Sequence, residues 1–220
     1  MVQIVSIEGN IGSGKSTVVN TLCEYFNGRE SNGNRNVYFL EEPVNEWVKI
    51  QDLEGKNIIE KFYEDQDKYS FSFQMMAYIS RLVMLKNAIK YCEQNNIKLI
   101  ICERSLQTDK NVFCKMLYDT GKIEEINYQI YLKWFDEFIV DMPKTYFVYI
   151  KTDPVIAFER IIKRNRKGEK INLNYLESCS SYHDYWLVDD NGKDTIIVNG
   201  NGDSHKTLAQ TKRIIDSFLN

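Results

Sequence analysis

A chain of 220 residues has the size of one ordinary domain, because a single hydrophobic core usually stops growing above about 250 residues. With 43% apolar residues and no repeated or low-complexity tract, the sequence excludes disordered and solenoid proteins. The 28 basic and 31 acidic residues nearly balance, which gives no overall positive field for nucleic acid or an anionic membrane. We expect one domain over residues 1–220 and neither of these two partners.

The cysteines and the N-terminus indicate a cellular compartment. The five cysteines are scattered and form no C-x-x-C pair, so we expect free thiols, which suit a reducing environment. The segment Val2–Ile7 already has the composition of a buried strand and leaves no room for a signal peptide. No apolar run approaches the roughly 20 residues of a membrane span. We therefore expect a soluble, cytoplasmic protein.

Apolar runs rich in branched and aromatic residues alternate with segments of helical spacing along the whole chain. The predicted strands are Val2–Ile7, Val37–Leu40, Leu99–Cys102, Thr145–Ile150 and Thr195–Val198. The predicted helices are Lys15–Asn27, Gln66–Gln94, Ser105–Tyr118, Glu124–Val140, Pro154–Arg164, Leu173–Val188 and Leu208–Leu219. This order indicates an α/β fold with a five-stranded, mostly parallel sheet flanked by helices, and with its sites at the carboxyl ends of the strands.

The first strand leads into the pattern G-x-x-x-x-G-K-[ST], which opens the first helix and is typical of a phosphate-binding loop. Glycines let backbone amides approach phosphate oxygens, and the helix N-terminus adds partial positive charge. We expect Lys15 to bridge the outer phosphates of ATP and Ser16 to bind Mg²⁺. The alternative is a glycine-rich turn that only caps the helix. The predicted loop is Gly9, Asn10, Ile11, Gly12, Ser13, Gly14, Lys15, Ser16 and Thr17.

Two carboxylates, Glu41 and Glu42, end the second strand, and Trp47 follows five residues after Glu42. A carboxylate at this strand end faces the same cleft as the phosphate loop, where it could take a proton from an acceptor hydroxyl. The alternative is a pair of solvated carboxylates at the edge of the sheet.

The long helix carries an unusual polar stripe. Gln74, Ala77 and Arg81 fall within about 60° of one another at 100° per residue, so an amide, a small gap and a guanidinium share one face. On the helix after Ser105, Asp109 and Phe113 offer a carboxylate and an aromatic ring one turn apart. Together these side chains could bind and stack against a nucleobase. Two alternatives remain: Arg81 and Asp109 form a purely structural ion pair, and Phe113 belongs to the core.

The third strand ends in Glu103-Arg104-Ser105. A carboxylate beside a phosphate loop can bind Mg²⁺ directly or through water, and Arg104 can reach the reacting oxygens. The alternative is an ion pair at a strand end, with Ser105 as the N-cap of the next helix in either case.

A basic cluster near the end of the predicted helix Pro154–Arg164 predicts an arginine-rich lid over about residues 163–171. Phosphoryl transfer gains rate when charge on the transferred group is neutralised, and a mobile arginine segment provides that charge. We expect Arg160, Arg164 and Arg166 to bind ATP phosphates; a solvated helix face is the alternative. The cluster is Arg160, Lys163, Arg164, Arg166, Lys167 and Lys170, with Gly168 expected to break the helix.

Taken together, these motifs resemble the deoxynucleoside kinase family from about Ile4 to Trp186. The resemblance implies a P-loop kinase fold, ATP and Mg²⁺, and a role in nucleotide salvage. It is carried by Glu8–Thr17, Glu42-Pro43 with Trp47, Tyr63, Phe73-Gln74, Glu103-Arg104-Ser105, Glu159-Arg160 with Arg164 and Arg166, Asn174–Glu177 and Tyr185-Trp186.

The resemblance also implies roles for individual residues. Glu42 would be the base on the 5′-hydroxyl of a deoxynucleoside with Arg104 beside it, and Lys15 would act on the phosphates. Substrate-binding positions would be Trp47, Tyr63 and Glu169 (the last two on the 3′-hydroxyl), Gln74, Arg81, Asp109 and Phe113; Mg²⁺ would be held by Ser16 and Glu103. A homodimer built on the helices at 66–94 and 124–140 is implied as well.

Arg81 and Asp109 match the deoxycytidine and deoxyguanosine enzymes, whereas thymidine-preferring members carry Met and Ala at these positions. We therefore expect deoxyadenosine, deoxyguanosine or deoxycytidine to be preferred over thymidine. The chain departs from the family at Ile162, Gly168 and Phe62. Two other functions remain open, a nucleoside monophosphate kinase such as thymidylate kinase and a non-catalytic nucleotide-binding subunit.

Overall fold

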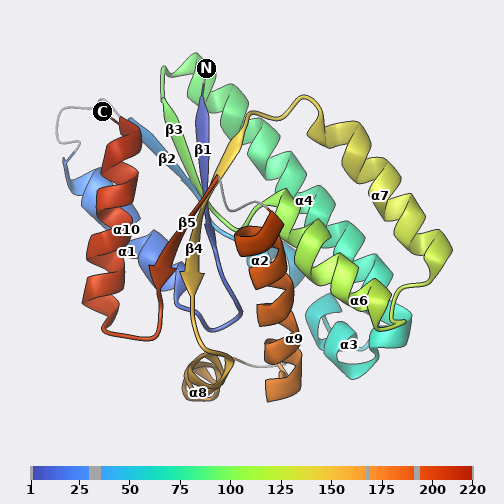
Figure 1. Ribbon diagram of the computed structural model, residues 1–220. Coiled ribbons are helices and arrows are strands. Elements are labelled where there is room, and N and C mark those ends of the chain that lie inside the picture. The colour runs from blue at the N-terminus through green and yellow to red at the C-terminus, as the bar shows by residue number, and fades with distance from the viewer. Residues whose placement is uncertain (1, 30–35, 167–168, 191–193, 220) are drawn as a thin grey trace.

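The computed structural model in Figure 1 describes residues 2–29, 36–166, 169–190 and 194–219. Its five strands form one sheet in the order β2-β3-β1-β4-β5, and every neighbouring pair is parallel. This confirms the predicted α/β class. The strands are β1 (Gln3–Glu8), β2 (Val37–Leu40), β3 (Leu99–Glu103), β4 (Thr145–Lys151) and β5 (Thr195–Asn199).

Both faces of the sheet are buried because the inner strands carry buried residues at consecutive positions, and successive side chains point to opposite faces. Val5 and Ile7 pack with α1 (Lys15–Arg29) and α10 (Ser204–Leu219) on one face. Ile4 packs toward α4 (Gln66–Gln94) on the other face, which also carries α7 (Glu125–Ile139). Figure 1 shows these two layers on opposite sides of the sheet.

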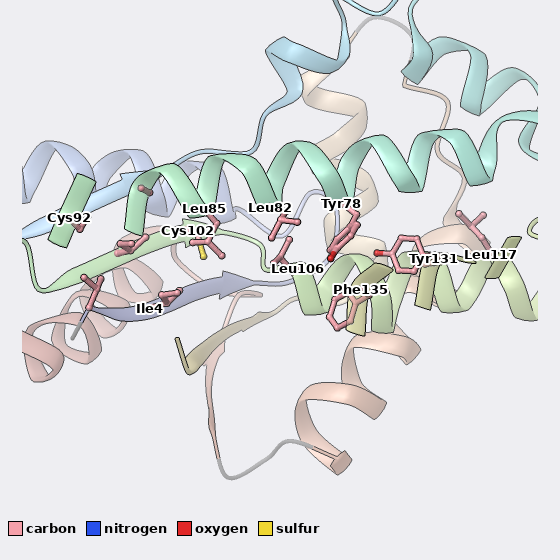
Figure 2. Close-up of a cluster of buried hydrophobic side chains, with 14 of the residues drawn as sticks. Ile4, Tyr78, Leu82, Leu85, Cys92, Cys102, Leu106, Leu117, Tyr131 and Phe135 are labelled. Atoms are coloured by element: carbon pink, nitrogen blue, oxygen red, sulfur yellow. The ribbon is translucent and has the colours of Figure 1, made fainter. Parts of the chain in front are cut away.

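The core on the α4 side fixes the helix that later lines the site. Asp65 caps α4 by accepting a hydrogen bond from the Lys68 amide, and apolar residues then recur at helical spacing along its inner face. Figure 2 shows Leu82 and Leu85 over the sheet, with Tyr78 beside Tyr131 of α7. The ring centroids of Tyr78 and Tyr131 are 5.5 Å apart.

Several predicted helices differ in detail. The helix predicted at Ser105–Tyr118 consists of α5 (Leu106–Thr108), a π-helical turn η1 (Asp109–Cys114) and α6 (Lys115–Asp119). The one predicted at Leu173–Val188 is α9 (Leu173–Asp184) followed by a second π turn, η2 (Tyr185–Asp190). The last helix begins earlier than predicted, at Ser204. The prediction for Pro154–Arg164 is confirmed as α8.

Two short helices were not predicted, α2 (Val44–Trp47) and α3 (Ile58–Glu64). Each is too short for apolar periodicity to be visible. A local signal was present for α3, where Asn57 and Glu60 form a reciprocal capping box.

Since all strands are parallel, their carboxyl ends meet at one edge of the sheet, which places the phosphate loop, Glu42 and Arg104 on the same side. Within the described residues, no helix combines the length and apolar composition that a membrane span requires.

Candidate active site

A cavity of about 880 Å³ opens at the carboxyl edge of the sheet. It brings together residues that lie up to 164 positions apart, from Ile11 to Tyr175. The predicted site residues that line it are Ile11, Gly12, Gly14, Lys15, Ser16, Thr17, Glu42, Trp47, Tyr63, Gln74, Arg81, Glu103, Arg104, Asp109, Phe113, Arg160, Arg164, Arg166 and Glu169. Gly9, Asn10 and Ser13 lie in the loop but are not among the described residues that line the cavity.

The phosphate loop is packed tightly against its neighbours. A Cβ atom on Gly9 would lie 2.7 Å from the Ile150 carbonyl oxygen, and one on Gly12 would lie 2.4 Å from that of Ala157. Their φ angles are +147° and +79°. The Asn10 side chain donates to the Leu176 carbonyl at 2.8 Å, which fixes the loop to α9. Gly9, Gly12 and Asn10 therefore maintain the conformation of the loop, and the glycines also let phosphate approach its backbone.

Lys15 and Ser16 lie at the start of α1 and face the cavity. The Lys15 ammonium is buried and donates to the Asn10 carbonyl oxygen at 2.8 Å. Burial, together with the nearby Arg104, lowers the pKa of Lys15 to about 7 despite the surrounding carboxylates. Ser16 Oγ donates to Glu103 Oε1 at 2.7 Å, so the two predicted Mg²⁺ ligands are adjacent.

Glu42 is the carboxylate that the structure places opposite the phosphate loop. Its Oε1 accepts from Arg81 Nη2 at 3.0 Å and lies 3.4 Å from Arg104 Nε. Burial favours the neutral carboxyl, but the charges of Arg104, Arg81 and Lys15 outweigh it and lower the pKa of Glu42. Glu42 is therefore ionised near neutral pH.

Arg81 and Asp109 form a buried ion pair, and both residues line the cavity. Arg81 Nε donates to Asp109 Oδ2 at 2.9 Å, while Asp109 Oδ1 is 3.4 Å from Nη2. The Arg81 guanidinium also donates to the Glu103 carbonyl at 3.0 Å and to Glu42. Burial raises the pKa of Asp109 against the opposing charge of Arg81. Arg81 thus connects Glu42, the candidate general base, to Asp109, the carboxylate expected to bind the nucleobase. Nothing in the sequence indicated the contact with Glu42.

Arg104 has an unusual backbone for a residue other than glycine. Its φ of +65° lies in the left-handed region, which costs an L-residue about 1 to 2 kcal/mol. Its guanidinium carbon is 4.8 Å from the centroid of the Phe113 ring, a cation–π distance. Its Nη1 is buried and has no hydrogen-bond partner among the described residues.

An aromatic wall completes the cavity. Trp47 contacts Phe73 edge-on, and Phe73 stacks on Phe62 at 4.7 Å between centroids. Tyr63 follows Phe62 edge-on, and burial raises its pKa. Trp47 Nε1 donates to Ser80 Oγ at 2.8 Å, which fixes the indole against α4. Phe62 and Phe73 were not among the predicted site residues, and aromatic residues on amphipathic helices give no signal that separates core from cavity.

Two of the arginines predicted to bind phosphate, Arg160 and Arg164, have protein partners. Arg160 Nη1 donates to the Ser13 carbonyl at 3.2 Å and its Nη2 to the Gly200 carbonyl at 2.9 Å. Arg164 forms an ion pair with Glu169, and α8 ends at Arg164, with Asn165 in the left-handed conformation. Lys167 and Gly168 lie outside the described residues.

A model of the family described as deoxynucleoside kinase matches residues 5–220. A probable deoxycytidine kinase of fowlpox virus is 32% identical over 207 residues, which cover 90% of this chain and 79% of the viral protein. Deoxycytidine kinase 2 of Gallus gallus is 30% identical, with 84% of this chain and 74% of the relative covered. The mitochondrial thymidine kinase 2 of Homo sapiens is 32% identical, with 84% and 64% covered.

Proposed function

This chain belongs to the deoxynucleoside kinase family, and we propose that it transfers the γ-phosphoryl group of ATP to the 5′-hydroxyl of a deoxynucleoside. One observation carries the proposal: an ionised, arginine-bound carboxylate, Glu42, faces the same cavity as the phosphate-loop residues Lys15 and Ser16. That arrangement lets a base and a phosphate site act on one pair of substrates.

In this mechanism Glu42 takes the proton of the acceptor hydroxyl as the hydroxyl oxygen attacks the γ-phosphorus of ATP. The bond between that phosphorus and the β–γ bridging oxygen breaks, and ADP leaves. General-base catalysis of this kind contributes about 10²- to 10⁴-fold in rate. Arg104 and Arg81 keep Glu42 ionised and fix its direction. Lys15 donates to Asn10 in this structure and would exchange that carbonyl for phosphate oxygens when ATP binds.

Mg²⁺ fits the adjacent oxygens of Ser16 and Glu103. Hydroxyl and carboxylate oxygens are ligands of the type that Mg²⁺ prefers, and Mg²⁺ in kinases is commonly bound through one or two protein ligands plus substrate phosphates. When bound, the ion would neutralise charge on the phosphates.

The lid arginines would complete the phosphate site. Arg164 would leave Glu169 for a phosphate oxygen, which would free the Glu169 carboxylate for the 3′-hydroxyl beside Tyr63. Arg160 and Arg166 line the same cavity and would add charge.

For the base, we propose a preference for deoxyadenosine, deoxyguanosine or deoxycytidine over thymidine. Asp109 Oδ1 is 3.4 Å from Arg81 and retains capacity to accept a hydrogen bond, which suits the exocyclic amino group that adenine, guanine and cytosine carry and thymine lacks. Thymine would present its O4 acceptor to this carboxylate. An unpaired buried contact costs about 1 to 3 kcal/mol, or about 5- to 150-fold in kcat/KM. The named relatives include both deoxycytidine and thymidine kinases, so similarity alone does not select the base.

One acceptor panel tests these points. At fixed ATP and Mg²⁺, product formation is measured with the four deoxynucleosides and with their four 5′-monophosphates. We expect turnover with deoxynucleosides and the lowest kcat/KM for thymidine. Turnover only with monophosphates would favour a nucleoside monophosphate kinase, and tight ATP binding without any turnover would favour a non-catalytic subunit. Thymidine as the best acceptor would refute the base preference alone.

We further propose a homodimer that buries the outer faces of α4 and α7. Ile126, Ile130 and Trp134 recur every fourth residue of α7 and are exposed, as are Ile79 and Val83 of α4. Exposed apolar residues that recur along one face of a helix are typical of an interface. We expect Trp134→Glu to convert a dimer into a monomer in light scattering, while Val155→Glu, on the exposed surface of α8, leaves it dimeric. A monomeric wild type would refute the proposal.

A cytoplasmic location is the last part of the proposal. All five cysteines are free, and the four other than Cys23 are buried, which suits a reducing compartment. Cell fractionation with antibodies against the protein tests it, and recovery in an oxidising compartment would contradict it.

A further inference from the structure

Glu8 is a buried carboxylate for which the proposed mechanism has no use. It ends β1 directly before Gly9, is fully buried, and is not among the described residues that line the cavity. A buried carboxylate is costly unless its oxygens are hydrogen-bonded. Both oxygens of Glu8 are: Oε1 accepts from Ser6 Oγ at 2.7 Å and Oε2 from Thr108 Oγ1 at 2.5 Å.

The two hydrogen bonds of Glu8 differ in what they connect. Ser6 lies on the same strand, two residues away, so its bond is local. Thr108 lies 100 residues further along the chain, at the end of α5. The Glu8–Thr108 hydrogen bond therefore joins the strand that leads into the phosphate loop to the segment that follows β3.

Thr108 belongs to the turn that lies between two residues of the acceptor site, Arg104 and Asp109. Its amide donates to Ser105 Oγ at 3.2 Å, and its hydroxyl lies 3.5 Å from the Ser105 amide, which closes a capping box. Arg104 directly precedes this box and Asp109 directly follows it. A shift of the turn would displace both residues together.

The backbone of Arg104 makes this support necessary. A left-handed φ at a residue other than glycine persists only where the surroundings enforce it. Two consecutive residues of β1 do so: the Ile7 carbonyl accepts from the Arg104 amide at 3.1 Å, and Glu8 accepts from Thr108. The next residue of the chain, Gly9, begins the phosphate loop.

We propose that Glu8 is a positioning residue that sets the acceptor-side groups Arg104 and Asp109 relative to the phosphate loop through its hydrogen bond to Thr108. The inference rests on the proposed function, because it concerns the alignment of the acceptor with ATP. Misplacement of reacting groups by about 1 Å can cost about a hundredfold in rate.

Thr108→Val is the direct test, because it removes the hydroxyl, keeps the shape and changes no charge near Lys15. We expect kcat to fall between about tenfold and a hundredfold and KM for the deoxynucleoside to rise, while KM for ATP stays unchanged. Thr108→Ser restores the hydroxyl and should recover most of the lost kcat.

Ser6→Ala is the matched control, since it removes the other hydrogen bond of the same carboxylate without touching the link to Thr108. We expect it to lower the melting temperature but to leave kcat near wild type. If Thr108→Val does not fold, Glu8→Asp withdraws the carboxylate by one methylene with its charge kept, and the same loss of kcat at unchanged ATP KM is expected.

Unchanged kinetics in Thr108→Val, or an equal loss of kcat in Ser6→Ala, would overturn the inference. Wild-type formation of a deoxynucleoside 5′-monophosphate is measured in the same assay. If the wild type forms none, the proposed function fails; if it does and Thr108→Val equals it, only the role of Glu8 fails.

Discussion

Replacing Arg81 by methionine is expected to destabilise the protein more than replacing Arg81 and Asp109 together. The two side chains are 8% and 4% exposed, and Arg81 also contacts Glu42. Removing one partner of a buried pair costs about 3 to 5 kcal/mol, because the remaining charge is left unpaired. For a chain of this size each kcal/mol lowers the melting temperature by about 2 to 4 °C, so we expect a loss of about 10 °C.

The double variant Arg81→Met with Asp109→Ala removes both charges and should recover more than half of this loss. Thermal unfolding of wild type, both single variants and the double variant completes the cycle. Lys122→Met serves as a control, because its ion pair with Asp67 is exposed and should contribute little. The reasoning is refuted if Arg81→Met has the melting temperature of the wild type, or if the melting temperature of the double variant is no higher than that of Arg81→Met.

Arg81→Met should also change the pH dependence of the reaction. Arg81 is one of the charges that lower the pKa of Glu42, so its removal raises that pKa. Because Glu42 acts in its ionised form, the acid limb of kcat/KM against pH should move to higher pH. If the acid limb of Arg81→Met stays at the wild-type pH, Arg81 does not lower the pKa of the catalytic base.

Three further predictions concern single side chains. Burial lowers the pKa of Lys15 to about 7, so the folded protein releases this proton at lower pH than the unfolded chain does. Between pH 7 and 10 the free energy of unfolding of the wild type, measured by denaturant titration, should therefore rise by about 4 kcal/mol relative to that of Lys15→Met. If the difference between the two free energies does not change with pH, Lys15 is not a buried charge. Ser16→Ala should raise the Mg²⁺ concentration for half-maximal activity by about tenfold, whereas an unchanged requirement would remove Ser16 from the metal site. Phe113→Leu should raise KM for the deoxynucleoside by about fivefold at unchanged ATP KM, and an effect on ATP alone would exclude stacking on the base.

Local patterns predicted much of the site. The spacing from Gly9 to Ser16 fixes a strand, a loop and a helix at once, and short apolar runs placed the five strands to within a residue or so at each end. The helical stripe of Gln74, Ala77 and Arg81 was visible because one helix carries all three residues. The parallel sheet then brings the strand ends together, so motifs far apart in the chain meet.

Other features had no local signal. The contact of Arg81 with Glu42 spans 39 residues and depends on how α4 crosses the sheet. The π turns at Asp109–Cys114 and Tyr185–Asp190 have nearly the same apolar spacing as an α-helix, so the sequence predicted uninterrupted helices there. Arg160 binds backbone carbonyls of Ser13 and Gly200, which no side-chain pattern encodes.

The most direct test compares Glu42→Gln with Glu41→Gln in the single-turnover rate of deoxynucleoside 5′-monophosphate formation at saturating ATP and Mg²⁺. Both variants replace a carboxylate by an amide of the same shape at adjacent positions, but only Glu42 is bound by Arg81 and Arg104. We predict a rate about 10²- to 10⁴-fold below wild type for Glu42→Gln with unchanged ATP affinity, and a rate near wild type for Glu41→Gln. A wild-type rate in Glu42→Gln, or a loss confined to ATP affinity, would contradict the assignment of Glu42 as the base.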